Sequence, residues 1–159
     1  MDLSTLFRPA DLLVDFHAVD KWNALDKLMD HVVASAGIGE EISRTMREAV
    51  LLRERSMSTG MERGIAIPHA AVEGIEDVLA CIGVVSRDGG LAFDSIDGQP
   101  TQFVVLLLIP KAKKLVHIRT LADIARVLGQ DAVRAALLAA RSGEEAWHAL
   151  SEWEGAHPA

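Results

Sequence analysis

The stretch FVVLLLIP, residues 103–110, is a run of seven apolar residues that ends at Pro110. Crossing a bilayer takes about 20 such residues, so this run is far too short to span a membrane. Its length and composition are typical of a buried strand. Two more apolar segments, 79–86 and 64–67, are also predicted to be strands, because turn sequences rich in Gly and Asp lie between the segments.

The regions on either side of these strands follow helical periodicity. Asp20 can cap a helix that stops at Gly37, and Ser142 with Glu145 forms a capping-box pattern. Helices are predicted over 20–37, 40–55, 115–128, 131–141 and 142–153, and a short strand over 12–16. The order of these elements predicts an α/β fold in which a small mixed β-sheet is flanked by helices. We expect residues 1–159 to form a single domain.

Composition narrows the range of functions. The chain has 159 residues and a formal net charge of −7, which disfavours binding to nucleic acid. The N-terminus lacks a basic stretch followed by an apolar core, so we expect neither a secretory signal nor membrane insertion. Cys81 is the single cysteine, so a disulfide within the chain and a multi-cysteine metal site are excluded. We therefore expect a cytoplasmic protein.

His69 is the most conspicuous candidate for chemistry. It follows Gly64-Ile65-Ala66-Ile67, a strand's worth of apolar residues, and then Pro68. Proline fixes its own φ and biases Ile67 toward extended structure, so the backbone that leads to His69 is stiff. Neutral imidazole has one nitrogen with a lone pair, which can act as a nucleophile. A stiff backbone before His69 suits that role, because it holds the ring in place. The alternative is a histidine that simply packs at the end of a strand.

Other chemical motifs find little support. The histidines do not have the spacing that puts two metal ligands on one helical face, and no metal site is predicted. Residues 60–64 do not fit a P-loop, and no serine occupies a Gly-x-Ser-x-Gly elbow. Cys81 lies within a predicted strand, where a buried and unreactive thiol is expected.

The stretch RERSMSTGMERGIAIPHA, residues 53–70, resembles the phosphorylation-site signature of the fructose/mannitol-type enzyme IIA family of the sugar phosphotransferase system. Two later stretches, FDSIDGQPTQFVVLLLIP at 93–110 and HIRTLADIARVL at 117–128, are also similar to family segments. The opening, residues 3–38, resembles the stand-alone nitrogen-regulatory branch. The resemblance implies the enzyme IIA fold for the chain.

By this resemblance, His69 is the phosphoryl acceptor, as tele-phosphohistidine, and His117 and Arg53 are the other active-site residues. Such roles agree with the chemistry, because a guanidinium fork and an imidazole N–H can both hold phosphate oxygens. The alternatives are a surface arginine paired with Glu54 or Glu48 and a histidine at the start of a helix.

The resemblance also implies the partners. We expect an HPr- or NPr-like histidine-phosphorylated carrier protein as donor, and either a regulatory target protein or a IIB domain as receiver. No cofactor is implied, since the phosphoryl group arrives from a protein. We favour the interpretation that the chain is a phosphotransferase component that signals by its phosphorylation state. The alternatives are a sugar-specific IIA that serves fructose/mannitol-type uptake and a binding module that is not phosphorylated.

Two positions depart from the family pattern. Glu62 stands where a second loop glycine is usual, and Ala71 stands where a basic or polar residue often follows the histidine. Glu62 is expected to repel an acidic partner or to pair with Arg63. Both departures bear on recognition of the partner or on phosphorylation.

Overall fold

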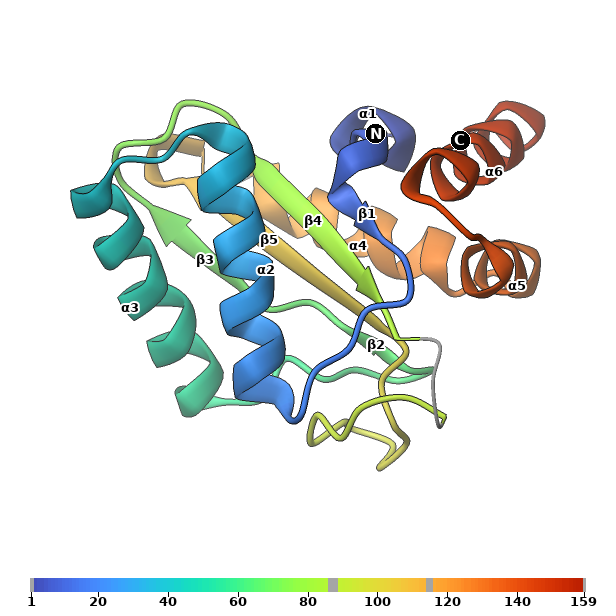
Figure 1. Ribbon diagram of the computed structural model, residues 1–159, viewed down its shortest axis with the longest axis horizontal. Coiled ribbons are helices and arrows are strands. Elements are labelled where there is room, and N and C mark those ends of the chain that lie inside the picture. Colours follow the sequence, from blue (N-terminus) through green and yellow to red (C-terminus); the bar gives the residue numbers. More distant parts are fainter. Residues whose placement is uncertain (1, 86–88, 114–115, 159) are drawn as a thin grey trace.

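The apolar run that ends at Pro110 forms the central strand of the sheet (Figure 1). The computed structural model describes residues 2–85, 89–113 and 116–158, and only the backbone at 116 and 117. Strand β5 (Phe103–Pro110) pairs antiparallel with β4 (Leu79–Val84), which pairs parallel with β1 (Leu12–Leu13). On its other side β5 pairs parallel with β2 (Ile65–Ala66) and β3 (His69–Val72). The predicted small mixed sheet is confirmed.

Every residue of β5 is buried because helices cover both faces of the sheet. Alternate side chains of a strand point to opposite faces. Phe103, Val105, Leu107 and Ile109 join one apolar core, which also contains residues of α1 and of α4 to α6 and is called here the α4–α6 core. Val104, Leu106 and Leu108 join the other, called the α2/α3 core. A strand that is covered on both faces consists of a continuous run of apolar residues, and such a run is easily recognised in the sequence.

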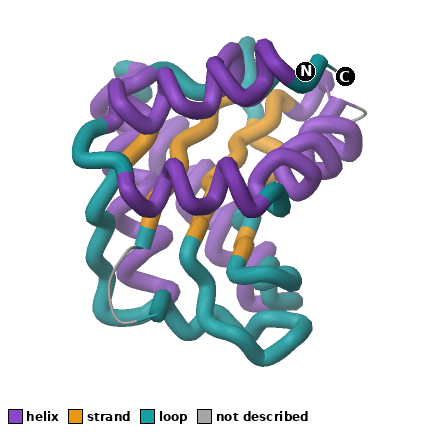
Figure 2. Tube along the Cα trace, turned by 90° about the vertical axis from the view of Figure 1, so that its right-hand side faces the viewer, coloured by secondary structure: helices purple, strands orange, loops and turns teal. Residues whose placement is uncertain are grey.

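Two long helices cover one face of the sheet (Figure 1), and Figure 2 shows the strands lying between helices. Helix α2 (Lys21–Ala36) is capped by the Asp20 carboxylate, which accepts a hydrogen bond of 2.8 Å from the Asn23 N–H. The helix stops at Gly37, whose φ of 65° is accessible to glycine without strain. Helix α3 (Glu40–Ser56) then returns alongside β3. Both predicted helices are confirmed.

The opposite face is covered by three helices near the end of the chain. These are α4 (Val116–Leu128), α5 (Asp131–Ala139) and α6 (Gly143–Ala156). The Ser142 hydroxyl caps α6 by accepting a hydrogen bond of 3.1 Å from the Glu145 N–H, as the sequence predicts. The short helix η2 (Lys111–Lys113) lies between β5 and α4. No helix within the described residues is long and apolar enough to cross a membrane.

The start of the chain differs from prediction. Residues for which no element is predicted form α1 (Leu3–Leu6) and the short helix η1 (Pro9–Asp11), while the predicted strand 12–16 is reduced to β1. The Glu154 carboxylate of α6 explains α1, because it accepts hydrogen bonds from the Leu3 and Ser4 N–H groups at 2.6 and 2.8 Å. Trp147 adds a hydrogen bond from its indole N–H to the Ser4 carbonyl at 3.0 Å. These partners lie over 140 residues away in the sequence, so no local pattern predicts them.

Two other boundaries differ. Strand β4 ends at Val84, short of the predicted limit, and residue 86 lies outside the described residues. The predicted strand 64–67 is confirmed only at β2, and a second strand, β3, follows Pro68. His69 therefore begins a strand and does not end one.

A buried carboxylate joins η1 to α2. Asp11 is 4% exposed and accepts a hydrogen bond of 2.9 Å from Arg8 Nε, while its other oxygen lies 3.0 Å from His31 Nε2. Burial alone would raise the pKa of the Asp11 carboxyl, but the hydrogen bonds from Arg8 and His31 outweigh burial and hold this pKa below its usual value. The carboxylate therefore stabilises the fold above the unfolded-state pKa of about 3.9, and this contribution is lost as the pH falls through the folded-state value.

We expect Asp11→Asn to flatten the acid side of the stability profile. Wild-type protein should lose stability between about pH 5 and pH 3, and the variant should start lower and lose less over that interval. Urea unfolding at each pH measures the difference, with the exposed Asp26→Asn of α2 as the matched control. Parallel profiles for wild type and Asp11→Asn would contradict this role.

Candidate functional site

His69 lies at the edge of the sheet, at the first position of β3. Its register partner in β5 is Leu107. Ala70 and Val72 belong to the α2/α3 core, so the alternation of the strand directs the half-buried His69 side chain toward the opposite face, which α4 covers. Ile67 and Pro68 lie between β2 and β3, immediately before the histidine.

The imidazole ring is oriented by a backbone carbonyl. His69 Nδ1 lies 2.7 Å from the Ile67 carbonyl oxygen. A carbonyl oxygen only accepts hydrogen bonds, so Nδ1 is the protonated nitrogen. In the neutral ring the lone pair then belongs to Nε2, the tele nitrogen. This geometry suits a nucleophile that reacts through Nε2.

Arg53 lies in the last turn of α3, which covers the other face of the sheet. Figure 1 shows α3 and β3 side by side and running in opposite directions, so the end of α3 and the start of β3 lie at the same end of the pair. The Arg53 Nη1 group donates a hydrogen bond of 2.7 Å to the Met57 carbonyl. That contact accounts for one of the five N–H donors of a guanidinium.

The alternative role of Arg53, as a surface charge paired with Glu54, is not what the structure shows. The Glu54 side chain is buried, and its carboxylate accepts hydrogen bonds from the Thr59 N–H at 2.8 Å and from the Thr59 hydroxyl. Its third partner is the Lys21 ammonium at 3.2 Å. Sequence reasoning missed Lys21, Glu54 and Thr59 as a group, because nothing in their spacing reveals that they converge.

His117 belongs to the first turn of α4, but its side chain lies outside the described residues. The backbone places this turn beyond the end of β5, whose last residues pair with the end of β3. Helix α4 packs on the face toward which the His69 side chain points. The fold thus puts the helix that contains His117 on the same side of the sheet as the His69 ring.

The loop between α3 and β2 is packed without spare room. A Cβ atom added at Gly60 would lie 2.6 Å from the Phe93 carbonyl oxygen, so only glycine fits there. The Ser58 hydroxyl donates a hydrogen bond of 2.6 Å to the same carbonyl. These contacts fix the loop that Ser58, Thr59 and Gly60 form before β2.

Glu62 is exposed at the tip of this loop, and it lines a hollow of about 300 Å³ together with Met61, Ile65, Ile96 and other residues. Its expected partner Arg63 is engaged elsewhere. The Arg63 Nη2 group donates a hydrogen bond of 2.8 Å to Asp131, and the Arg63 N–H donates one of 3.0 Å to Asp97. Glu62 therefore presents its charge on a surface next to β2.

Cys81 is fully buried, as predicted, and its Sγ lies 3.6 Å from the Leu28 carbonyl oxygen. Burial raises the pKa of this thiol far above its usual range. A thiol that stays protonated and inaccessible is unreactive. Cys81 belongs to the core and not to the site.

Comparison with known proteins shows the family of the chain. The model of the family described as "Phosphoenolpyruvate-dependent sugar phosphotransferase system, EIIA 2" matches residues 5–153. The chain is 36% identical over 137 residues to the nitrogen regulatory protein of Klebsiella oxytoca, and the match covers 86% of this chain and 82% of that protein.

Solved structures share the fold. The nitrogen regulatory protein IIA-Ntr of Neisseria meningitidis superposes with a TM-score of 0.79 at 22% identity, covering 93% of this chain and 98% of that one. Enzyme IIA for mannitol of Escherichia coli, in complex with phosphorylated enzyme IIB, superposes with a TM-score of 0.71 at 17% identity, covering 92% and 97% of the two chains. The chain belongs to the EIIA type 2 family of the phosphoenolpyruvate-dependent sugar phosphotransferase system, and it is of the nitrogen-regulatory type.

Proposed function

We propose that this chain is a phosphohistidine carrier in the cytoplasm that receives a phosphoryl group on His69 Nε2 and signals by its phosphorylation state. The donor is an HPr- or NPr-like carrier protein phosphorylated on histidine. The observation that supports this most directly is the hydrogen bond from His69 Nδ1 to the Ile67 carbonyl at 2.7 Å, because it leaves the nucleophilic lone pair on Nε2. Family membership supports the role of a phosphotransfer component.

The transfer is a displacement at phosphorus. The Nε2 lone pair attacks the phosphorus atom of the carrier's phosphohistidine, and the P–N bond of the donor breaks with its electron pair returning to the donor ring. As the new N–P bond forms, positive charge develops on the His69 ring. The hydrogen bond from Nδ1–H to the Ile67 carbonyl then becomes charge-assisted and stabilises that charge.

Arg53 and His117 would hold the phosphoryl oxygens. Arg53 lies at the end of α3 that is next to the start of β3, and its fork can bind two oxygens. His117 would donate one N–H from the face that α4 covers. The product differs from the unmodified protein by about −1.5 to −2 charges at one edge of the sheet, a change large enough to switch the binding of a target protein.

Incubation with enzyme I, the carrier protein and labelled phosphoenolpyruvate tests the proposal. We expect one label per chain, destroyed by acid and stable to alkali, since phosphoramidates of histidine have this stability and serine esters do not. A folded chain that takes no label would contradict the proposal and favour a binding module that works without phosphorylation.

A second candidate is a sugar-specific IIA that passes the phosphoryl group to a separate IIB protein. The similar fold of the mannitol enzyme IIA, solved in complex with phosphorylated enzyme IIB, favours it. Mixing the labelled chain with a purified fructose- or mannitol-type IIB distinguishes the two candidates. Rapid loss of label to IIB supports transport, and retention of label supports regulation.

We expect His117→Ala to slow phosphorylation, onward transfer or both, because an N–H that holds a phosphoryl oxygen is lost while the acceptor remains. Rapid-quench measurement of labelling and of transfer to the carrier gives both rates. The exposed His148→Ala of α6 is the matched control. Rates within about twofold of wild type in both directions would return His117 to an ordinary position at the start of a helix.

Glu62→Gly should leave stability almost unchanged, because the exposed carboxylate lies next to an arginine that Asp131 engages. Its effect should appear in the rate of phosphorylation by the carrier. If the charge repels an acidic partner, the variant should be faster at low salt, and the difference should shrink as salt screens the charge. Equal rates for variant and wild type at every salt concentration would assign Glu62 to an ordinary solvated loop.

A further inference from the structure

Three buried polar side chains meet behind the loop that precedes β2. The Lys21 ammonium at the start of α2 lies 3.2 Å from a Glu54 carboxylate oxygen, and their side chains are 9% and 1% exposed. The same carboxylate accepts hydrogen bonds from the Thr59 N–H at 2.8 Å and from the Thr59 hydroxyl. The cluster thus joins α2, α3 and the loop at one point.

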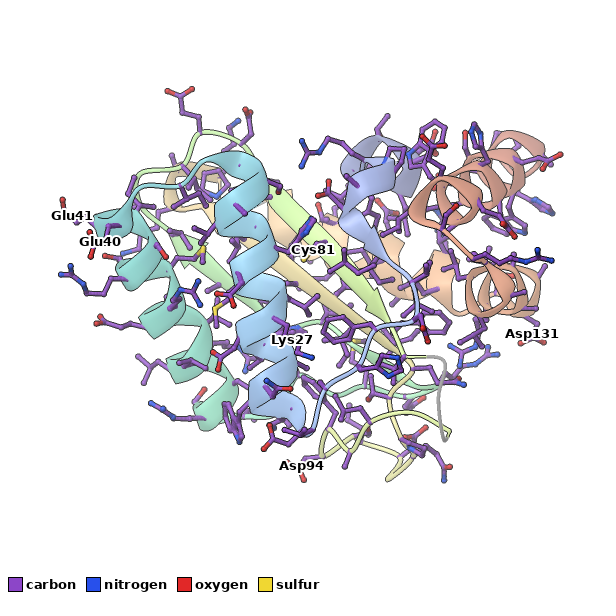
Figure 3. All side chains as sticks on the ribbon, in the orientation of Figure 1. Lys27, Glu40, Glu41, Cys81, Asp94 and Asp131 are labelled. Atoms are coloured by element: carbon purple, nitrogen blue, oxygen red, sulfur yellow. The ribbon has the colours of Figure 1, made fainter. Side chains whose placement is uncertain are left out.

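Two aromatic rings and a second carboxylate border this ion pair. The Lys21 ammonium lies 5.3 Å from the centre of the Phe93 ring and 5.2 Å from that of Trp22. Its second anionic partner, at 3.3 Å, is Asp94, which is mostly exposed and lies in the loop between β4 and β5, near the start of α2 in Figure 3. Removing one partner of a buried ion pair leaves the other charge uncompensated, which is costly. The Lys21 ammonium therefore holds the Glu54 carboxylate in place.

From this cluster a chain of hydrogen bonds leads to the imidazole of His69. The Thr59 carbonyl, on the residue that Glu54 holds, accepts a hydrogen bond of 3.2 Å from the Ile67 N–H. The Ile67 carbonyl accepts the hydrogen bond of 2.7 Å from His69 Nδ1. The backbones of two residues, Thr59 and Ile67, therefore link the buried carboxylate to the ring through three successive hydrogen bonds.

We propose that Glu54, held by Lys21, is a positioning residue that sets the orientation and tautomer of the His69 ring through the backbones of Thr59 and Ile67. This role rests on the proposed function of His69. Phosphoryl transfer needs the attacking nitrogen in line with the bond that breaks, and a displacement of about 1 Å can cost on the order of a hundredfold in rate. Glu54 does not touch the phosphoryl group; it fixes the carbonyl that decides which nitrogen is the nucleophile.

The first test is the rate of labelling of His69 in variants of the cluster. Glu54→Gln replaces one acceptor oxygen by an NH₂ group that faces the donors of Lys21 and Thr59, and we expect phosphorylation to slow at least about fivefold. Thr59→Val removes only the hydroxyl and should also slow it, while Thr59→Ser should restore the wild-type rate. The exposed Glu48→Gln on the same helix is the matched control.

The second test separates positioning from stability. Long-range ¹H–¹⁵N spectra of the imidazole nitrogens report the tautomer of each neutral histidine. Wild type and Thr59→Ser should have His69 protonated on Nδ1, and Glu54→Gln and Thr59→Val should have a larger fraction protonated on Nε2. A merely structural role would lower the melting temperature without this change of tautomer.

The outcomes distinguish the two proposals. A wild-type chain that takes no label on His69 would overturn the proposed function, and this role with it. Label on wild type, together with unchanged rates and an unchanged His69 tautomer in the folded variants, would overturn the positioning role alone. If Glu54→Gln does not fold, the comparison of Thr59→Val with Thr59→Ser tests the positioning role through the same two measurements, the rate of labelling and the tautomer of His69.

Discussion

Replacement of His69 by alanine should abolish acid-labile phosphorylation of the chain completely. The variant keeps Arg53 and the whole of α4 but lacks the nitrogen that would form the N–P bond. The fold should survive, because the ring is half-buried at the edge of the sheet and lies outside both apolar cores. Loss of its hydrogen bond to the Ile67 carbonyl should cost about 1 kcal/mol of unfolding free energy.

Labelled phosphoenolpyruvate, enzyme I and the carrier measure this result, and circular dichroism with urea unfolding verifies the fold. His148→Ala, which removes an exposed imidazole from α6, should be labelled like wild type. A well-folded His69→Ala chain that still accepts one label would place the acceptor on another residue and remove His69 from the site.

Arg53→Lys should slow phosphorylation at least about tenfold, which corresponds to about 1.4 kcal/mol of transition-state stabilisation. Lysine keeps the positive charge but lacks the planar fork that can hold two phosphate oxygens. The stability should change little, since an ammonium can still donate a hydrogen bond to the Met57 carbonyl that Arg53 contacts. Arg53→Lys therefore tests the role of the planar guanidinium fork separately from the role of the positive charge.

The rate of labelling by the phosphorylated carrier measures the effect, with melting temperature as the check on the fold. Arg55→Lys alters an exposed arginine two residues further along α3 and should have the wild-type rate. If Arg53→Lys were labelled as fast as wild type, the fork would have no part in transfer and the arginine would be only a contact at the end of α3.

The elements that the sequence predicts well are those whose pattern is set by local chemistry. Strand β5 is a continuous apolar run because both faces are covered, and α2 has both an Asp20 cap and a stop at Gly37. By contrast, α1 depends on Glu154, and its four residues are too few for periodicity to reveal. Contacts that join the two ends of a chain leave no trace in a short window of sequence.

The same reasoning applies to the site. His69 stands out because Pro68 and the apolar run before it are adjacent in the sequence, and the structure gives it the carbonyl partner that fixes its tautomer. The burial of Glu54 is not evident from the sequence, because the charged residues next to it are typical of a solvated helix face. Only the fold reveals that Lys21 and Thr59 surround it. A charge whose partners come from two other segments cannot be recognised from its neighbours along the chain.

The hydrogen bonds from Leu3 and Ser4 to Glu154 have a practical consequence for engineering. They bring the first and last helices together beside β1, at one edge of the sheet, while His69 lies at the other edge (Figure 1). A short peptide linker could join these helices, and the chain could be opened at an exposed turn elsewhere to give a circular permutant. Fluorescent domains attached near α1 and α6 would leave the edge with His69 accessible, which makes this protein a scaffold for a genetically encoded reporter of phosphoryl flux.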